Sequence, residues 1–136
     1  MTGKLLPLTT GNFTVSNIEK LTLVLNIGTN NHNIYDNLAA QILTAKLNIK
    51  NHVPACEKLD DAIRYGDQKV RLVNYNGPRS VTLESTNNEM RNMITAHTTI
   101  SQFNSHGCFN TIPTGIPLFP NFHSIILMTP LGLFVN

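Results

Sequence analysis

The chain has 136 residues and a net charge of +2 at pH 7, with 41% hydrophobic but only 13% charged residues. This length predicts one domain, which can bury about two thirds of its unfolded surface without a covalent staple. The small charge and the absence of a Lys/Arg cluster argue against nucleic-acid binding. No run of about 18 apolar residues predicts a membrane span, and the first ten residues do not have the pattern of a signal peptide.

Neutral polar residues fill the share that charged residues leave, with Asn at about 18 positions. A neutral polar surface favours association over colloidal repulsion, which suits a protein that packs against copies of itself or works in an extracellular layer. An AT-rich genome would enrich Asn and Ile without any physical purpose, and the composition leaves both explanations open. Asn12-Phe13-Thr14 fits an N-glycosylation sequon, a pattern that often occurs by chance.

The first 15 residues predict coil with a short strand over 13–15. Ser16 and Glu19 then have the spacing of a capping box, which predicts the start of a first helix. Apolar residues recur at helical spacing as far as Gly28, which is placed to end that helix. An Asn-rich loop is expected over residues 29–33.

Two further helices are expected in the middle of the chain. One begins at Tyr35 or Asp36, ends between residues 48 and 51, and has a wide apolar face. Pro54 suits the first position of the next helix, and Gly66 is a plausible C-terminal stop.

Residues 67–84 change character, because strand-forming residues flank the turn dipeptide Asn76-Gly77. A short hairpin near 70–83 is one interpretation, and an extended loop packed over the helices is the other, since Pro78 follows the Gly directly. A fourth helix is expected after them. Its start is predicted by the capping-box spacing of Thr86 and Glu89, and it should fray before Gly107.

The predicted fold class is therefore mainly α, with about four helices in one small domain over residues 1–109. Residues 110–136 are predicted to form an extended, Pro-rich, apolar arm, because four prolines prevent ordinary helix propagation. The arm could wrap back onto the core, add an extended segment to a neighbouring subunit, or be the remnant of a sorting signal. Its candidate assembly residues are Phe119, Phe122, Ile125, Ile126, Leu127, Leu131, Leu133 and Phe134.

The two cysteines are the sharpest chemical feature of the sequence. Cys56 lies near the start of the third helix and Cys108 follows the fourth, so packed helices could bring the two into bonding range. A disulfide would close a loop of about 50 residues, stabilise by roughly 3–4 kcal/mol, and indicate an oxidising compartment. A zinc site of His52, Cys56, His106 and Cys108 is a weaker alternative, since the spacing matches no familiar finger. Two unlinked thiols are the third possibility.

No other residues form a convincing catalytic set. We expect His97 to be a core or boundary histidine, and nothing orients a nucleophilic pairing of Cys108 with His97 or His106. Asp60-Asp61 reads better as a solvated helix face than as a catalytic pair. No Gly-rich phosphate loop, GxSxG elbow or HExxH motif is present, so the sequence predicts no catalytic residue, no cofactor and no enzyme.

Residues 38–49, LAAQILTAKLNI, resemble a helix of secreted and cell-surface proteins of bacteria and archaea, which typically reads LA-x-QL-x-AAKLN. Residues 15–26, VSNIEKLTLVLN, are similar to the T-x-x-ELL-x-IL segment that precedes this helix in that family.

Downstream, Cys56, residues 61–63 and residues 100–108, ISQFNSHGC, are similar to the family's Cys, AI-x-x-AD helix and closing GHC segment. The resemblance covers residues 14–109 and implies a helical module in which Cys56 pairs with Cys108. It also implies a place at the cell surface more than an activity.

Together these features predict a non-catalytic extracellular structural or adhesive module that associates with copies of itself in a surface layer or filament. The alternative is a small structural subunit of a larger intracellular or organellar complex, with its C-terminal segment buried against a partner.

Overall fold

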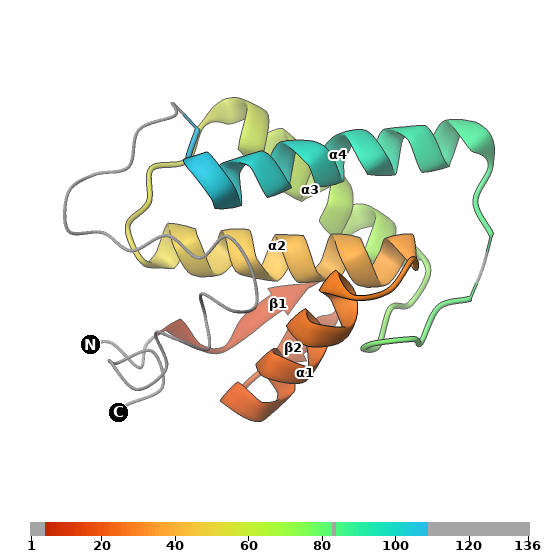
Figure 1. The fold of residues 1–136 in the computed structure, drawn as a ribbon, viewed down its shortest axis with the longest axis horizontal. Coiled ribbons are helices and arrows are strands. Elements are labelled where there is room, and N and C mark those ends of the chain that lie inside the picture. Colours follow the sequence, from red (N-terminus) through yellow and green to blue (C-terminus); the bar gives the residue numbers. More distant parts are fainter. Residues whose placement is uncertain (1–4, 83, 109–136) are drawn as a thin grey trace.

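The computed structural model describes residues 5–82 and 84–108. These residues form a short hairpin and four helices (Figure 1). The elements are β1 Leu8–Thr10, β2 Phe13–Val15, α1 Ile18–Thr29, α2 Ile34–Lys50, α3 Glu57–Leu72 and α4 Asn87–His106. The mainly helical fold class is confirmed. The predicted arm over 110–136, with its assembly residues, lies outside the described residues.

Helix α2 is the centre of the fold, because α1, α3 and α4 all pack against it (Figure 1). Its side chains are buried around most of the helix, as the wide apolar face predicted. Helices α3 and α4 run antiparallel, and an ion pair joins Lys69 near the end of α3 to Glu89 at the start of α4. The core consists of large side chains that this arrangement removes from water. Its fully buried members include Leu21, Leu25, Leu38, Ile42, Leu43, Leu47, Leu59, Met93 and Ile100.

The predicted N-terminal cap is observed at α4, whereas the cap of α1 differs from the prediction by one residue. Thr86 and Glu89 form the predicted capping box at the start of α4. Helix α1 is capped by Asn17 instead of Ser16, since the Asn17 side chain accepts a hydrogen bond from the Lys20 N–H at 2.8 Å. Asn and Ser cap helices about equally well, so the local pattern did not decide between the two neighbours.

Gly66 was predicted to end a helix, and this prediction is wrong because α3 continues to Leu72. The end predicted at Gly28 is close to the observed one, since α1 ends one residue later at Thr29. A Cβ at Gly28 would lie 2.5 Å from the Ala40 Cβ and 2.6 Å from the Asp36 carbonyl oxygen. A Cβ at Gly66 would lie 2.7 Å from the Ile42 Cδ1. Both glycines therefore let α1 and α3 approach α2 closely.

Of the two interpretations of residues 70–83, the loop is the observed one. Helix α3 extends through Val70, which is fully buried, and residues 73–82 contain no strand. Tyr75 and Val81 point into the core and hold this loop over the helices. Asn74 has a φ of 57°, in the left-handed region, which interrupts the extended backbone that a strand before the Asn-Gly turn would need.

The only sheet in the described part of the chain is the hairpin of β1 and β2, in which Leu8 pairs with Val15 and Thr10 with Phe13. The predicted strand over 13–15 is confirmed. Gly11 opens the two-residue loop at φ +58, as a tight hairpin turn requires. The ring of buried Phe13 packs edge-on against that of Tyr75, with centroids 5.3 Å apart, so the hairpin joins the helical core.

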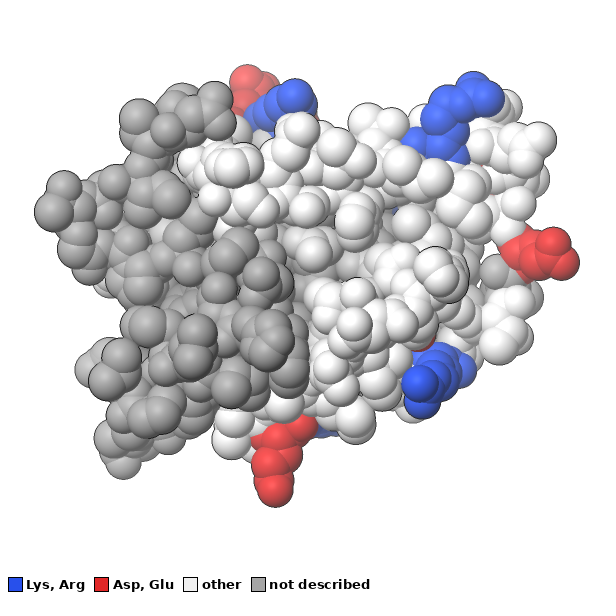
Figure 2. All heavy atoms as spheres, in the orientation of Figure 1, with Lys and Arg blue, Asp and Glu red and all other residues white. Residues whose placement is uncertain are grey.

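Charged groups are sparse on the surface. Figure 2 shows one face on which isolated Lys, Arg, Asp and Glu side chains stand at the margins of a largely uncharged described surface. None of the helices within 5–82 and 84–108 is long and apolar enough to cross a membrane.

Candidate functional site

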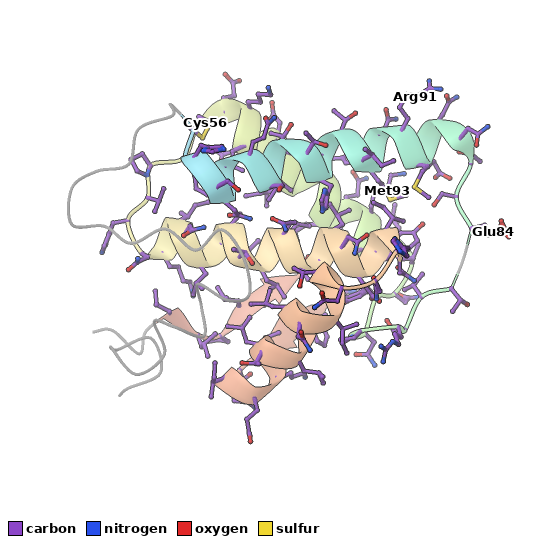
Figure 3. All side chains as sticks on the ribbon, viewed as in Figure 1. Cys56, Glu84, Arg91 and Met93 are labelled. Atoms are coloured by element: carbon purple, nitrogen blue, oxygen red, sulfur yellow. A yellow bond between two sulfur atoms is a disulfide. The ribbon has the colours of Figure 1, made fainter. Side chains whose placement is uncertain are left out.

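A disulfide joins Cys56 to Cys108 and links the start of α3 to the chain just beyond α4, with Cα atoms 6.0 Å apart. Cys56 is the N-cap residue of α3, and its side chain makes no capping hydrogen bond. Gly107 has a φ of 74°, which turns the chain out of α4 and brings Cys108 back toward α3. Figure 3 shows Cys56 beside the C-terminal end of α4. The antiparallel packing of α3 and α4 therefore brings the two cysteines together at one end of the helical body.

A cavity of about 360 Å³ lies beside the disulfide. The side chains of Leu59 and Phe103 contribute an apolar wall, and those of Lys58, Gln102 and His106 contribute polar groups. The lining among the described residues combines a positive charge and neutral donors with an oxidised cysteine pair. The Lys58 ammonium suits contact with a polar or anionic segment. His106 is of the residue type that most often serves in general acid–base catalysis, whereas the bonded cysteines offer no nucleophilic thiol.

The disulfide also excludes the two other predictions for the cysteines in this structure, a zinc site and two unlinked thiols. Sulfur atoms bonded to each other cannot serve as thiolate ligands, so the zinc set of His52, Cys56, His106 and Cys108 does not form in this structure. His52 lies exposed in the loop between α2 and α3. Within the described ranges, no group of three or more His, Cys, Asp or Glu side chains could hold a metal ion.

The remaining candidate residues have the ordinary environments that were expected of them. His97 is half-buried on α4, and burial lowers the pKa of its imidazole, which makes the neutral form predominate near pH 7. Cys108 is disulfide-bonded, so it has no free thiol to pair with His97. Asp60 and Asp61 are exposed, and Asp61 forms an ion pair with Arg64 at 2.9 Å. The solvated helix face is confirmed.

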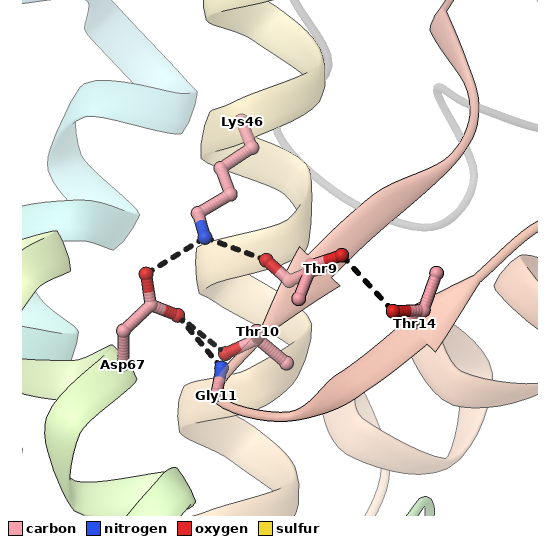
Figure 4. Close-up of polar contacts among 6 residues, drawn as sticks. All are labelled: Thr9, Thr10, Gly11, Thr14, Lys46 and Asp67. Atoms are coloured by element: carbon pink, nitrogen blue, oxygen red, sulfur yellow. Dashed lines mark hydrogen bonds and ion pairs between the residues drawn. The ribbon is translucent and has the colours of Figure 1, made fainter.

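A second group of polar contacts, which the sequence did not reveal, anchors the hairpin to the helices (Figure 4). The Lys46 Nζ of α2 donates to the Asp67 carboxylate of α3 at 2.7 Å and to the Thr9 carbonyl oxygen. The other Asp67 oxygen accepts from the Thr10 hydroxyl at 2.9 Å and the Gly11 N–H at 3.1 Å. One carboxylate thus holds the turn of the hairpin and the lysine together.

Lysine side chains also cover the outer edge of β1. Lys50 Nζ donates to the Pro7 carbonyl oxygen at 3.0 Å, while Lys46 occupies the Thr9 carbonyl oxygen. Pro7 has no N–H to offer. Short edge strands, prolines and lysines are the usual means by which proteins prevent another strand from pairing at an edge, so β1 is a poor place for strand addition.

A buried carboxylate closes the opposite end of the helical body. Asp36, in the first turn of α2, is 1% exposed. It accepts hydrogen bonds from the Asn31 side chain at 2.9 Å and from the Arg79 backbone N–H at 3.0 Å. Burial, with a contribution from the Asp36 charge, raises the pKa of the Tyr75 hydroxyl well above its usual range. Asp36 therefore ties the Asn-rich loop and the loop over residues 73–82 to one helix.

Buried amides connect α2 to α4 between these two ends. The Asn48 side chain donates to that of Asn104 at 3.0 Å, and Asn104 donates to the Gln41 Oε1 at 2.8 Å. Both asparagines are fully buried. Because an unpaired buried amide is costly, this set favours one register of α4 along α2. This set of buried amides was not predicted from the sequence.

The chain matches no protein-family model, no curated protein and no solved structure. The resemblance to a Cys-paired module of secreted and cell-surface proteins therefore stays a prediction, which depends on the residues that carry it.

Proposed function

We propose that this chain is a non-catalytic extracellular structural or adhesive module that assembles with copies of itself, as a surface layer or filament, through residues 110–136. The Cys56–Cys108 disulfide is the observation that carries the extracellular part of the proposal. Disulfides form and persist outside reducing compartments, and a chain of 136 residues does not need one merely to fold.

Two further features support the assembly part. Only 13% of the residues are charged, so like-charge repulsion between copies would be weak. The segment 110–136, which includes the eight candidate assembly residues, is rich in large apolar residues among its prolines, which suits an extended segment that binds in a groove better than a solvated tail. Because lysines cover the edge of β1, we expect such a segment to bind elsewhere on the neighbouring copy.

The first experiment tests export through the oxidation state of the native protein. Cells of the source organism are lysed in the presence of an alkylating agent, and the intact mass of the protein is measured. We expect no alkylation and a mass two hydrogens below that of the reduced chain. Two alkylated thiols would contradict the extracellular proposal, and the structural subunit of an intracellular or organellar complex would replace it.

The second experiment tests assembly through the C-terminal segment. The double variant Phe122→Asp, Ile126→Asp places charges in the apolar run, and Thr114→Asp adds a charge outside it as the control. Sedimentation velocity should show assemblies for the wild type and the control, and smaller species for the double variant with unchanged helical circular dichroism. Assemblies of unchanged size in the double variant would contradict the role of this segment.

A further inference from the structure

We propose that Asn12, at the tip of the β1–β2 hairpin, is the attachment site of an N-linked oligosaccharide. This inference depends on the proposed function, since the transferases that modify asparagine act on exported chains. Asn12 is followed by Phe13 and Thr14, which completes an Asn-X-Thr sequon. No other asparagine of the chain has Ser or Thr two residues later, so the sequence offers a single acceptor.

The hairpin presents this acceptor to solvent. Asn12 is the second residue of the two-residue loop, and it is exposed, as is Thr14, whereas Phe13 between them is only 4% exposed. The Asn12 side chain has no partner among residues 5–82 and 84–108. A sugar on its Nδ2 would therefore extend into water without displacing a contact, and the intervening Phe13 stays in the core.

The turn does not depend on the Asn12 side chain for its shape. Asp67 holds the loop from the inner side through the Gly11 N–H and the Thr10 hydroxyl (Figure 4). Gly11 supplies the positive φ that the turn requires. A modified Asn12 is thus compatible with the same hairpin, and replacing Asn12 should leave the fold unchanged.

The reaction requires a lipid-linked oligosaccharide pyrophosphate as donor. The Asn12 Nδ2 forms a bond to the anomeric carbon of the first sugar, the bond from that carbon to the phosphate oxygen breaks, and the amide loses one proton. The products are the glycosylated amide, the lipid pyrophosphate and the proton. In the closed hairpin the Thr14 hydroxyl is hydrogen-bonded to that of Thr9 at 3.1 Å. Since the transferase reads this hydroxyl, transfer should precede closure of the hairpin.

The test uses the full chain behind a cleavable export leader, in a cell that has an asparagine-linked oligosaccharyl transferase. Intact mass and a peptide map of the exported protein should show one oligosaccharide on the peptide that contains Asn12. Asn12→Gln and Thr14→Val should abolish the adduct, and Thr14→Ser should retain it because the hydroxyl remains. An exported, disulfide-bonded wild type without the adduct would overturn the proposal, as would an adduct that persists in Asn12→Gln.

The same measurements on protein from the source organism separate this inference from the proposed function. A disulfide together with the glycan on Asn12 supports both. A disulfide without a glycan overturns this inference alone and leaves the extracellular module standing. Free thiols without a glycan overturn both.

Discussion

The two ends of the helical body are closed by different chemistry. At one end a covalent bond between Cys56 and Cys108 holds α3 to the chain beyond α4. At the other end the buried carboxylate of Asp36 holds two loops through hydrogen bonds from Asn31 and Arg79. Helices α2 and α4 run between the two ends (Figure 1).

The difference shows what each kind of closure requires of its surroundings. The disulfide acts mainly by restricting the unfolded chain, so its half-exposed position costs little. The carboxylate stabilises only while every donor around it stays buried and aligned, because an unpaired buried donor is costly. One end therefore tolerates change in neighbouring side chains, and the other does not.

Removal of the covalent closure should have the largest effect. The double variant Cys56→Ser, Cys108→Ser opens a crosslink between residues 52 apart and should lower the free energy of unfolding by about 4 kcal/mol. Urea unfolding followed by circular dichroism measures this loss. The wild type reduced with a dithiol is the control and should show the same loss. A change below about 1 kcal/mol in both would contradict the chain-restriction account.

Removal of the buried carboxylate should come next. Asp36→Ala leaves the Asn31 amide and the Arg79 N–H without their acceptor, which should cost about 3 kcal/mol in urea unfolding. Asp36→Asn keeps one acceptor and should cost less. Asp60→Ala, at an exposed position, is the matched control and should stay within about 0.5 kcal/mol of the wild type. Equal values for Asp36→Ala and Asp60→Ala would remove the proposed contrast between the two ends.

The hairpin anchor should give a smaller effect, because its ion pair is partly exposed. The side chains of Lys46 and Asp67 are 27% and 24% exposed. Asp67→Ala should cost about 1–2 kcal/mol and speed hydrogen exchange of the β1–β2 amides before that of α2. Asp61→Ala removes a largely exposed ion pair and should change neither the free energy of unfolding nor the exchange rates. Unchanged exchange in Asp67→Ala would show that core packing of Phe13 alone holds the hairpin.

The smallest expected effect is on the pH dependence of the free energy of unfolding. The disulfide does not titrate, so it does not contribute to this dependence. Burial lowers the folded pKa of His97 below its ordinary 6.5, so the unfolded chain binds the proton first as pH falls. The free energy of unfolding should therefore decrease as pH drops through about 6.5, until the folded pKa is reached. Urea midpoints at about pH 7.5 and pH 5.5 should converge in His97→Gln, while the exposed-site control His106→Gln keeps the wild-type difference. If the urea midpoints of His97→Gln differ between the two pH values as much as those of the wild type, the pH dependence belongs to other groups.

Features that depend on neighbouring residues were predictable. The capping box of Thr86 and Glu89 is complete within four residues, and the apolar spacing of α2 lies within one helix. The disulfide was open to prediction only as a possibility, since it requires α3 and α4 to lie antiparallel. The cavity beside it was not predicted at all.

The glycines show why local patterns mislead. At Gly28 and Gly66 the sequence predicts helix ends, because glycine after an apolar run often marks one. The structure keeps Gly66 well inside α3 and ends α1 one residue after Gly28. Both positions lie against α2, and a window of neighbouring residues does not contain that constraint.

The sequence by itself determined that four segments form helices, that their joint fold class is mainly α, and which two cysteines could pair. Local spacing, caps and turn residues suffice for this, because they act within a few residues. Only the tertiary structure decided that Cys56 meets Cys108, that Asp36 is buried, and that Asp67 holds a hairpin 57 residues away through Thr10. Such contacts arise from the packing of whole helices against α2, so no short stretch of sequence contains them.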